Sequence, residues 1–412
     1  MERIQLNILE VLNVMNESST DQAVANQDGK RGSISEVVRL FLKLGTIGFG
    51  GPAAHIALMH DEVCRRRGWV SEQRFLDLLG AANLIPGPSS TEMAIYLGYE
   101  RTGWKGLIAS GVCFILPAML IVLALAWAYV EYGKMPQTSW LLYGIKPVIV
   151  AIIVQALWKL LKSAVKGPLL AGVGLLVLGL YFVGFNMVAL IFGSGLLVMG
   201  IQNRRRIWRQ GKGGDVGFVL LPALGLPMGQ IAAVASAPFS FKTLFLTFLK
   251  IGSVVFGSGY VLLAFLRNDF VRHLGWLTDQ QILDAVAVGQ FTPGPVFTTA
   301  TFIGYVLGGM PGAILATVAI FLPSFFFVAA VFPLVGFLRR SIWASGFLDG
   351  VNVGALGLMA GVTWQLGRAA IIDWLTVALA LVAAFVLFRF KVNSAWVVLS
   401  GGILGLVYKL LV

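Results

Sequence analysis

The sequence of 412 residues contains few charged residues. Asp, Glu, Lys and Arg together make up 12% of the chain, whereas hydrophobic residues make up 58%. Soluble globular proteins carry about 25% charged residues, so this chain has too few of them to cover the surface of a water-soluble body. The mean hydropathy of +0.84 points the same way. We therefore expect a protein that lies in a lipid bilayer, and not a soluble globular domain.

Cysteine and histidine are also scarce. The two cysteines, Cys64 and Cys113, form no CxxC motif, and the three histidines have no metal-binding spacing. The sequence therefore predicts no disulfide framework and no metal site. It also lacks a GxxxxGK(S/T) phosphate-binding loop and a dinucleotide-binding fingerprint. Because haem-type and iron–sulfur ligands are missing too, we expect no cofactor and no enzyme activity.

The formal net charge of +12 comes from short basic runs beside apolar segments. Such runs lie at residues 65–67, 204–206 and 339–340. Cytoplasmic loops of membrane proteins carry this kind of excess of Lys and Arg. The sequence shows no basic patch interleaved with stacking aromatic residues. We therefore expect the lipid bilayer as a partner, and no nucleic acid.

An internal repeat divides the chain into two halves. Residues 40–88 align with residues 247–295 at a constant offset of 207, and sixteen of these 49 positions are identical. The identities include the triplet Pro86-Gly87-Pro88, which matches Pro293-Gly294-Pro295. Shared hydrophobicity alone does not align such triplets in register. We predict a disordered cytoplasmic tail over 1–34, a first repeat over 35–203, a basic linker with a connecting span over 204–242, and a second repeat over 243–412.

The basic runs fit one topology in which the two halves are inverted relative to each other. Full spans are expected at residues 107–130, 140–158, 168–183, 186–203, 216–236, 311–337, 346–364, 370–388 and 394–411. Segments 35–64 and 71–100 have basic residues at both ends, so we expect each to enter the membrane and return, turning at a Gly- or Pro-rich tip. Ordinary kinked spans are the alternative. The predicted fold class is an all-α polytopic membrane protein with two inverted-topology repeats and broken or re-entrant helices at the midplane.

A helix that is broken inside a membrane exposes backbone N–H groups and the positive end of its dipole, and both favour an anion. Residues at the four tips are therefore candidates for binding an anionic substrate. In the first repeat they are Gly50, Gly51, Pro52, His55, Asn83, Pro86, Gly87, Pro88, Ser89, Ser90 and Thr91. In the second repeat they are Gly257, Ser258, Gly259, Gln290, Pro293, Gly294, Pro295 and Thr298. The first repeat has more hydroxyl donors after its triplet, so we expect the substrate there.

These candidates also have structural interpretations. The hydroxyls of Ser89 and Thr91 also suit helix capping, and glycines also allow close helix packing. His55 fits a structural histidine, and the amides of Asn83 and Gln290 also brace a broken backbone. The sequence leaves these alternatives open.

Three charged residues are candidates for coupling or charge compensation. Lys43 and Lys250 occupy equivalent positions in apolar stretches, where a cation is costly and a functional role is the default hypothesis. Snorkelling to the membrane surface is the alternative. Glu92 follows the first triplet, where a carboxylate opposes an anion unless it is protonated. We treat it as a candidate proton carrier, and compensation of the helix dipole is the alternative.

The stretches FLKLGTIGFGGPAAHIALMHDEV and NLIPGPSSTEMAIYLGY resemble the chromate ion transporter family, as do FLKIGSVVFGSG and AVGQFTPGPVFTTATFIGY in the second half. The resemblance covers nearly everything after residue 34 and implies the long, duplicated form. It places the family's motif positions on Gly50, Gly51, Pro52, His55, Pro86, Gly87, Pro88, Gly257, Gly259, Gln290, Pro293, Gly294 and Pro295. Asn83 departs from the Gln expected there, which weakens the case for substrate contact at that position.

The resemblance implies a secondary transporter that exports chromate, a sulfate-like oxyanion, across the bacterial inner membrane and confers chromate resistance. Alternating access would be driven by the membrane potential or the proton motive force. Moving a dianion outward along an inside-negative potential gains about 4.6 kcal/mol per 100 mV. A carrier of sulfate, molybdate or another oxyanion is the alternative, and a membrane-embedded reductase is a weaker one. The sequence leaves a homodimer open.

Overall fold

The structure is a computed structural model that describes residues 32–133, 135–210, 238–256, 259, 261–332, 342–390 and 392–411. Regular secondary structure in this part of the chain is entirely helical, without a β-strand, as the sequence predicts. The expected span over 216–236 and the basic residues 339–340 lie outside the described residues, as does most of the predicted tail.

The first repeat opens with two segments of broken helix. The first segment comprises α2 (Ile34–Ile47), α3 (Pro52–His60) and the π-helix η1 (Asp61–Arg66). The second comprises α4 (Glu72–Ala82) and α5 (Ser89–Thr102). Longer apolar helices follow, namely α6 (Trp104–Tyr132), α7 (Pro136–Ala164), α8 (Pro168–Val183) and α9 (Met187–Gln210).

The second repeat has the same order of elements. Its first broken segment comprises α10 (Phe241–Val254), α11 (Leu262–Leu266) and the π-helix η2 (Arg267–His273). Its second comprises α12 (Asp279–Phe291), the 3-10 turn η3 (Val296–Thr298) and the start of α13 (Thr299–Val331). Helix α13 is kinked at Gly308 and Gly309, so it corresponds to α5 and α6 joined end to end. The repeat ends with α15 (Ile342–Ala370), α16 (Trp374–Phe390) and α17 (Ser394–Leu411).

Local sequence explains where the broken helices begin and end. The side chains of Ser33, Ser71 and Thr278 accept hydrogen bonds from backbone N–H groups at the starts of α2, α4 and α12. Such caps satisfy donors that have no partner inside the helix. The helices then stop at Gly- and Pro-rich tips, where φ is positive at Gly50, Gly51, Gly87 and Gly294.

The ends of the first two broken segments meet on one side of the protein. Arg101, at the end of α5, pairs with Glu36 at the start of α2 (3.0 Å) and lies over the ring of Trp69 between the segments (5.0 Å). Arg74, near the start of α4, donates a hydrogen bond to Glu100 near the end of α5 (2.6 Å). Each segment therefore returns to the face that it left. The predicted hairpins, and not single kinked spans, are present.

The hairpins of the second repeat are arranged in the same way. Phe239, just before α10, packs on Trp276 between the hairpins, with 5.2 Å between ring centroids. The Phe239 ring also lies beside Gly308, where the first segment of α13 ends. The start, middle and end of this pair of hairpins are therefore close together.

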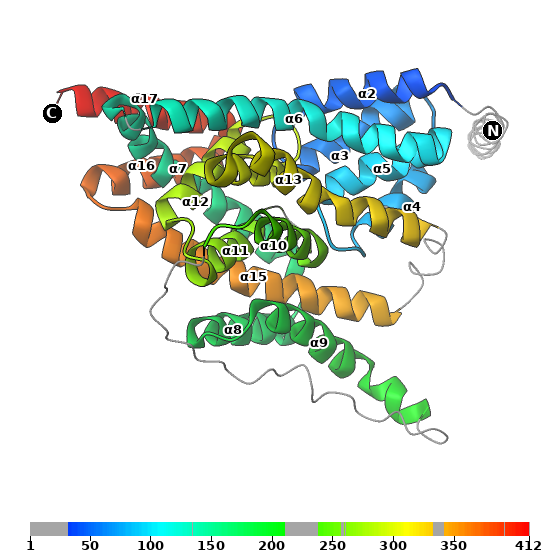
Figure 1. The fold of residues 1–412 in the computed structure, drawn as a ribbon. Coiled ribbons are helices and arrows are strands. Elements are labelled where there is room, and N and C mark those ends of the chain that lie inside the picture. Colours follow the sequence, from blue (N-terminus) through cyan, green and yellow to red (C-terminus); the bar gives the residue numbers. More distant parts are fainter. Residues whose placement is uncertain are drawn as a thin grey trace, which may run out of the picture.

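Helices α6 and α13 run between the two groups of hairpin ends. Trp104, at the start of α6, contacts Tyr99 in the first group (5.3 Å). Tyr129, near the end of α6, donates a hydrogen bond to Asp284 of α12 (2.9 Å). Phe332, just after α13, contacts Tyr99 (4.2 Å). The two helices therefore cross the protein in opposite directions (Figure 1).

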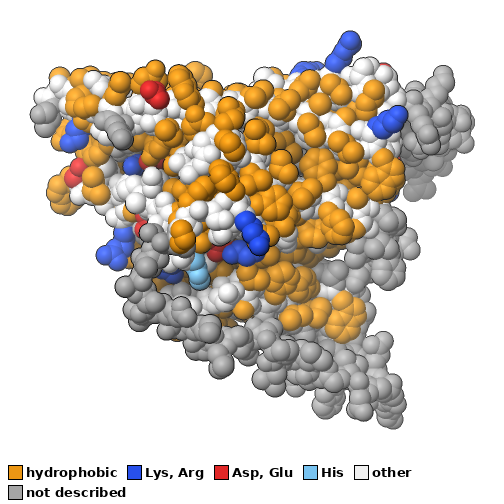
Figure 2. All heavy atoms as spheres, in the orientation of Figure 1, with side chains coloured by type: hydrophobic (Ala, Val, Ile, Leu, Met, Phe, Trp, Pro, Cys, Tyr) orange, Lys and Arg blue, Asp and Glu red, His pale blue; other side chains and the backbone are white. Residues whose placement is uncertain are grey.

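Within the described part of the chain, five helices are long and apolar enough to cross a bilayer, which needs roughly 17–25 residues. They are Trp104–Tyr132, Pro136–Ala164, Val296–Val331, Ser345–Ala370 and Ser394–Leu411. Figure 2 shows a broad hydrophobic surface with few charged side chains on the visible face. The protein is therefore a multi-pass membrane protein, as predicted. Helix α9 differs from the expected span because it continues from residue 203 to Gln210, and its added arginines are good helix formers.

Buried apolar side chains form two clusters. One surrounds the hairpins of the first repeat and includes Phe114 of α6 and Val328 of α13. The other contains the hairpins of the second repeat and the buried faces of α7, α9 and α15. Phe325 of α13 packs against both clusters. The crossing helices α6 and α13 therefore lie where the two clusters meet.

Candidate functional site

The tips of the two repeats are joined by a reciprocal pair of hydrogen bonds. Gly87 N–H donates to the carbonyl of Val255 (2.7 Å), and Gly294 N–H donates to the carbonyl of Gly48 (2.8 Å). At the offset of 207, Gly87 is equivalent to Gly294 and Gly48 to Val255. Each Pro-Gly-Pro tip is therefore bonded to the first tip of the opposite repeat, and the arrangement has pseudo-two-fold symmetry.

These joined tips lie at mid-length of the crossing helices. A β-carbon built on Gly294 would lie 2.7 Å from Cβ of Ala118, which is at the centre of the 29-residue helix α6. A β-carbon built on Gly87 would lie 2.8 Å from Oγ of Ser324 on α13. Ser324 and Ala118 occupy equivalent positions, one residue after Pro323 and Pro117. The tips therefore lie far from both ends of the spanning helices.

The tip glycines have backbone conformations that other residues rarely adopt. Gly87 has φ of 140° and Gly294 has φ of 92°, and Gly50 and Gly51 have φ of 105° and 79°. Positive φ favours glycine because other residues carry a β-carbon. At Gly87 that β-carbon would also collide with Oε1 of Glu92. Glycine is therefore required at this tip on two separate grounds.

The hydroxyls that follow the two triplets behave differently. Thr298 and Thr299 donate to the carbonyls of Pro295 (2.8 Å) and Val296 (2.7 Å). In contrast, α5 starts after Pro88 without a side-chain cap, and the buried Thr91 Oγ1 has no hydrogen-bond partner among the described residues. The first repeat therefore retains hydrogen-bonding capacity that the second repeat uses internally. Ser89 and Ser90 are buried beside Thr91.

Glu92 lies directly beneath the first Pro-Gly-Pro tip. Its side chain is fully buried, at 0% exposure, and it shares the space beside Gly87 with the Ser324 hydroxyl. The Ser324 hydroxyl is a hydrogen-bond partner of the Glu92 side chain. Burying a carboxyl group is costly, and such a hydrogen bond offsets part of that cost. Glu92 is equivalent to Thr299 of the second repeat, and Ser324 is equivalent to Ala118 of the first repeat, so the symmetry-related place at the other Pro-Gly-Pro tip lacks this polar pair.

His55 is bonded to the tip backbone. Its Nε2 lies 2.9 Å from the carbonyl of Gly48, which also accepts the Gly294 N–H, and its ring packs edge-on against Phe114 (5.4 Å). The equivalent residue of the second repeat is Leu262. His55 is therefore hydrogen-bonded to the first tip, and its place as a candidate site residue stays a prediction.

The remaining predicted tip residues differ in how deeply they are buried. Asn83 ends α4 and is exposed, whereas Gln290 is half-buried. Gly259 is buried, and a β-carbon there would lie 3.3 Å from Val296. Pro52 follows the Gly50-Gly51 turn as the first residue of α3. Gly257 and Ser258 lie outside the described residues.

Lys43 and Lys250 each pair with a carboxylate at equivalent positions. Lys43 Nζ lies 2.6 Å from Oε1 of Glu62, and Lys250 Nζ lies 2.6 Å from Oδ2 of Asp269. Each carboxylate is buried and each lysine is half exposed. Both lysines precede a tip by five residues, which is about 7.5 Å of helix. The pairs therefore flank the joined tips.

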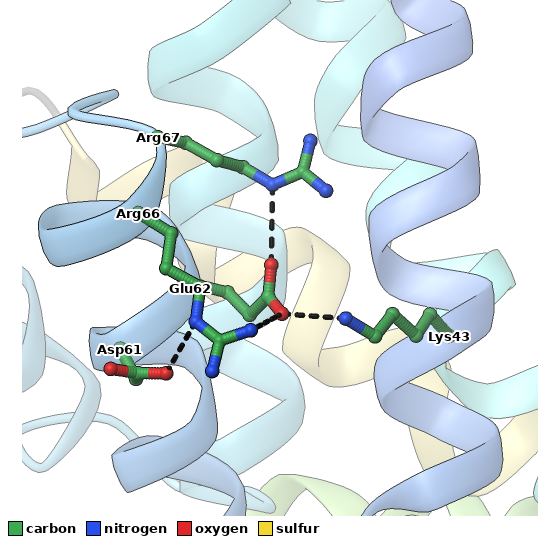
Figure 3. A network of polar contacts seen from close by, with 5 residues as sticks. All are labelled: Lys43, Asp61, Glu62, Arg66 and Arg67. Carbon is green, nitrogen blue, oxygen red and sulfur yellow. Dashed lines mark hydrogen bonds and ion pairs between the residues drawn. The ribbon is translucent and has the colours of Figure 1, made fainter.

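The Glu62 carboxylate receives further cations (Figure 3). Arg66 and Arg67 each place a guanidinium nitrogen 3.4 Å from a Glu62 oxygen, and Arg66 also pairs with Asp61 (2.8 Å). Glu62 lies in η1, outside the spanning helices. The hydrogen bond from Lys43 holds the pKa of Glu62 below its ordinary value, and Arg67 and Arg66 act in the same direction.

Sequence reasoning missed the buried ionic cluster around Asp284. Asp284 of α12 pairs with Lys146 of α7 (3.2 Å) and accepts a hydrogen bond from Tyr129 of α6 (2.9 Å). The Asp284 side chain is 4% exposed and that of Lys146 is 17% exposed. Lys146 could have pointed to this cluster, because it lies inside the expected span 140–158 and an ionisable residue within a membrane suggests a functional role.

Paired broken helices that meet at mid-length of spanning helices, in two copies of one repeat, are typical of secondary transporters. The fold and the site thus define a membrane transporter built from a duplicated unit. The chain belongs to the chromate transporter family, which it matches over residues 35–199 and again over residues 242–406. These two matches confirm the internal duplication and the predicted family.

Three relatives that match this chain over most of its length are named as chromate transport proteins, one of them as a probable one. The chain is 36% identical over 383 residues to a chromate transport protein of Cupriavidus metallidurans, covering 92% of this chain and 94% of that one. It is 36% identical to a probable chromate transport protein of Synechococcus elongatus, with 85% and 89% covered. It is 31% identical to a chromate transport protein of Pseudomonas aeruginosa, with 90% and 92% covered. No solved structure matches this chain.

Proposed function

We propose that this protein is a secondary transporter that exports chromate across the bacterial inner membrane and thereby confers resistance to chromate. The observation that carries the proposal is the meeting of broken-helix tips at mid-length of α6 and α13, with the hydroxyl of Thr91, unpartnered among the described residues, and the carboxyl of Glu92 buried at one of them. Two bacterial relatives that are named chromate transport proteins support chromate as the substrate.

The first Pro-Gly-Pro tip supplies the groups that an oxyanion needs. The N-terminus of α5 presents backbone N–H groups that precede the first intrahelical bond, donated by Thr91 N to Pro88 O. These amides and the helix dipole attract negative charge. The hydroxyls of Ser90 and Thr91 add donors in the first turn. Since the N–H of Gly87 is already used by Val255, the binding groups begin after the triplet.

The symmetry of the tips supports a mechanism of alternating access. Helices α6 and α13 cross the protein in opposite directions, which favours repeats of inverted topology over 35–203 and 243–412. The reciprocal Gly87–Val255 and Gly294–Gly48 bonds hold the tips together. Rocking of one repeat against the other around these tips opens the site to each side in turn.

Glu92 provides a means of coupling to protons. Oxyanion and carboxylate repel each other at short range, so binding beside Gly87 is accompanied by protonation of Glu92. The buried groups that face this carboxyl are Ser324 of α13 and Tyr96, one turn along α5. A dianion that moves with one proton carries one net negative charge, and outward movement along the membrane potential gains about 2.3 kcal/mol per 100 mV.

Uptake of labelled chromate into inverted membrane vesicles tests the proposal. Respiring inverted vesicles are positive inside, so they draw an exported anion inward. We expect saturable uptake with the parent protein and loss of uptake with Gly87→Ala. Gly184→Ala is the matched control, because Gly184 also has positive φ (99°) but has open space around its β-carbon position. Vesicles with the parent protein that accumulate no more chromate than empty-vector vesicles would refute the function.

Competition by sulfate and molybdate in the same assay defines the substrate range. The donors at the tip are hydroxyls and backbone amides, which bind any tetrahedral dianion. Preference for chromate is expected as a lower KM. A protein that transports sulfate at the same KM would be a general oxyanion carrier.

A further inference from the structure

A cavity of about 170 Å³ opens beside Lys250, at the base of the first hairpin of the second repeat. By the same measure of volume, a single water needs only about 10–15 Å³, so the cavity has room for a polyatomic anion. Its polar lining comes from the start of α9, from α10 and from η2. The polar lining residues are Asn186, Thr247, Lys250, Asn268, Asp269 and His273.

Few contacts hold the charged pair in this cavity. Lys250 Nζ lies 2.6 Å from Asp269 Oδ2, and the lysine side chain is 46% exposed. The amide of Asn268 donates to the other Asp269 oxygen (3.1 Å). Thr247 and His273 face the same space. An ammonium, an amide and a hydroxyl that converge on one cavity are donors for an anion.

At the equivalent positions of the first repeat, an ion-pair network takes the place of the cavity. Lys43 and Glu62 replace Lys250 and Asp269, while Asp61 and Arg66 replace Asn268 and His273. In Figure 3, Arg66 links Glu62 to Asp61 while Lys43 reaches Glu62 from α2. Thus a filled ion-pair network in one repeat corresponds to a cavity with a single lysine–carboxylate pair in the other.

We propose that the cavity beside Lys250 is an oxyanion-binding site at one end of the transport path, where the anion competes with Asp269 for the Lys250 ammonium. In the described part of the first repeat, the equivalent position has no such site, because Asp61 and Arg66 extend the ion-pair network around Glu62. This inference rests on the proposed function, because an anion that enters from this cavity has about 7.5 Å of helix between Lys250 and the tip at Val255.

Equilibrium binding of molybdate to the purified full-length protein in nanodiscs tests the competition. Molybdate serves as a tetrahedral dianion that does not oxidise thiols. Lys250→Gln is expected to weaken binding about tenfold, because a charge-assisted hydrogen bond is lost. Asp269→Asn is expected to tighten binding about threefold, because the ion pair that holds Lys250 is removed. A purely structural ion pair predicts no opposite effects.

Two further variants guard against misfolding. Lys250→Arg keeps the charge and is expected to bind within a few-fold of the parent, and Thr247→Val removes a cavity hydroxyl and is expected to weaken binding about twofold to threefold. The control is Asp349→Asn, which breaks the Lys166–Asp349 pair (2.8 Å) outside the cavity. It should leave the affinity unchanged.

The outcomes separate this inference from the proposed function. If Lys250→Gln, Asp269→Asn and Thr247→Val all bind molybdate as the parent does, while Gly87→Ala abolishes chromate uptake, the cavity is no oxyanion site and the transport proposal stands. Weaker binding by Asp269→Asn also contradicts the competition. If the parent neither binds nor transports an oxyanion, both proposals are wrong.

Discussion

Replacing Gly87 by alanine tests whether the first Pro-Gly-Pro tip is held as the structure shows. An alanine at φ of 140° costs about 1 kcal/mol in backbone strain. The new β-carbon would collide with Glu92 Oε1 and lie 2.8 Å from Ser324 Oγ, so the tip must move away. Moving it breaks the buried Gly87–Val255 hydrogen bond, which costs about 1–3 kcal/mol. We expect a total loss of about 2–4 kcal/mol.

Unfolding by sodium dodecyl sulfate measures this loss on purified protein. The control Gly184→Ala, with φ of 99° and open space, should lose only the strain of about 1 kcal/mol. Because Glu92 is the colliding partner, the double variant Gly87→Ala/Glu92→Ala should be more stable than the sum of the single effects predicts. Strict additivity, or equal losses for Gly87→Ala and Gly184→Ala, would refute the close contact between this tip and Glu92.

Three further outcomes follow from the charged groups. Glu92→Gln mimics the protonated acid, so oxyanion binding should persist but lose its pH dependence; an unchanged pH profile would exclude Glu92 as the proton site. Asp284→Asn leaves the Lys146 ammonium without its partner and should lower the free energy of unfolding by about 3 kcal/mol. If loss of the ion pair is the cause, adding Lys146→Met to this variant should restore most of that free energy. Because the pKa of Glu62 is lower in the folded protein, its ionised carboxylate stabilises the fold at pH values above the ordinary carboxyl pKa of about 4.3. This stabilisation should be lost as the pH falls through the lower folded pKa. The melting temperature of Glu62→Gln should therefore fall less on acidification than that of the parent.

The hairpins and the duplication were predictable because their signals are local in the sequence. The triplets at 86–88 and 293–295 break helices wherever they occur. Basic residues at both ends of segments 35–64 and 71–100 require each segment to return to its starting face. These signals depend on neighbouring residues, so one sequence is sufficient to find them.

Contacts between the repeats were not predictable in this way. The bond from Gly87 to Val255 and the contact of Glu92 with Ser324 join residues that are more than 150 positions apart. Such contacts depend on how α6 and α13 cross, which composition and periodicity do not specify. The sequence also does not specify how exposed a tip residue is: Asn83 is exposed, whereas Gln290 at the equivalent position is half-buried.

Diffraction from chromate-soaked crystals at the chromium absorption edge tests the central claim most directly. If broken-helix tips bind the oxyanion, an anomalous peak should lie within hydrogen-bonding distance of the first turn of α5, beside Ser90 and Thr91. A peak located only away from both Pro-Gly-Pro tips, in a protein that still transports chromate, would contradict the account.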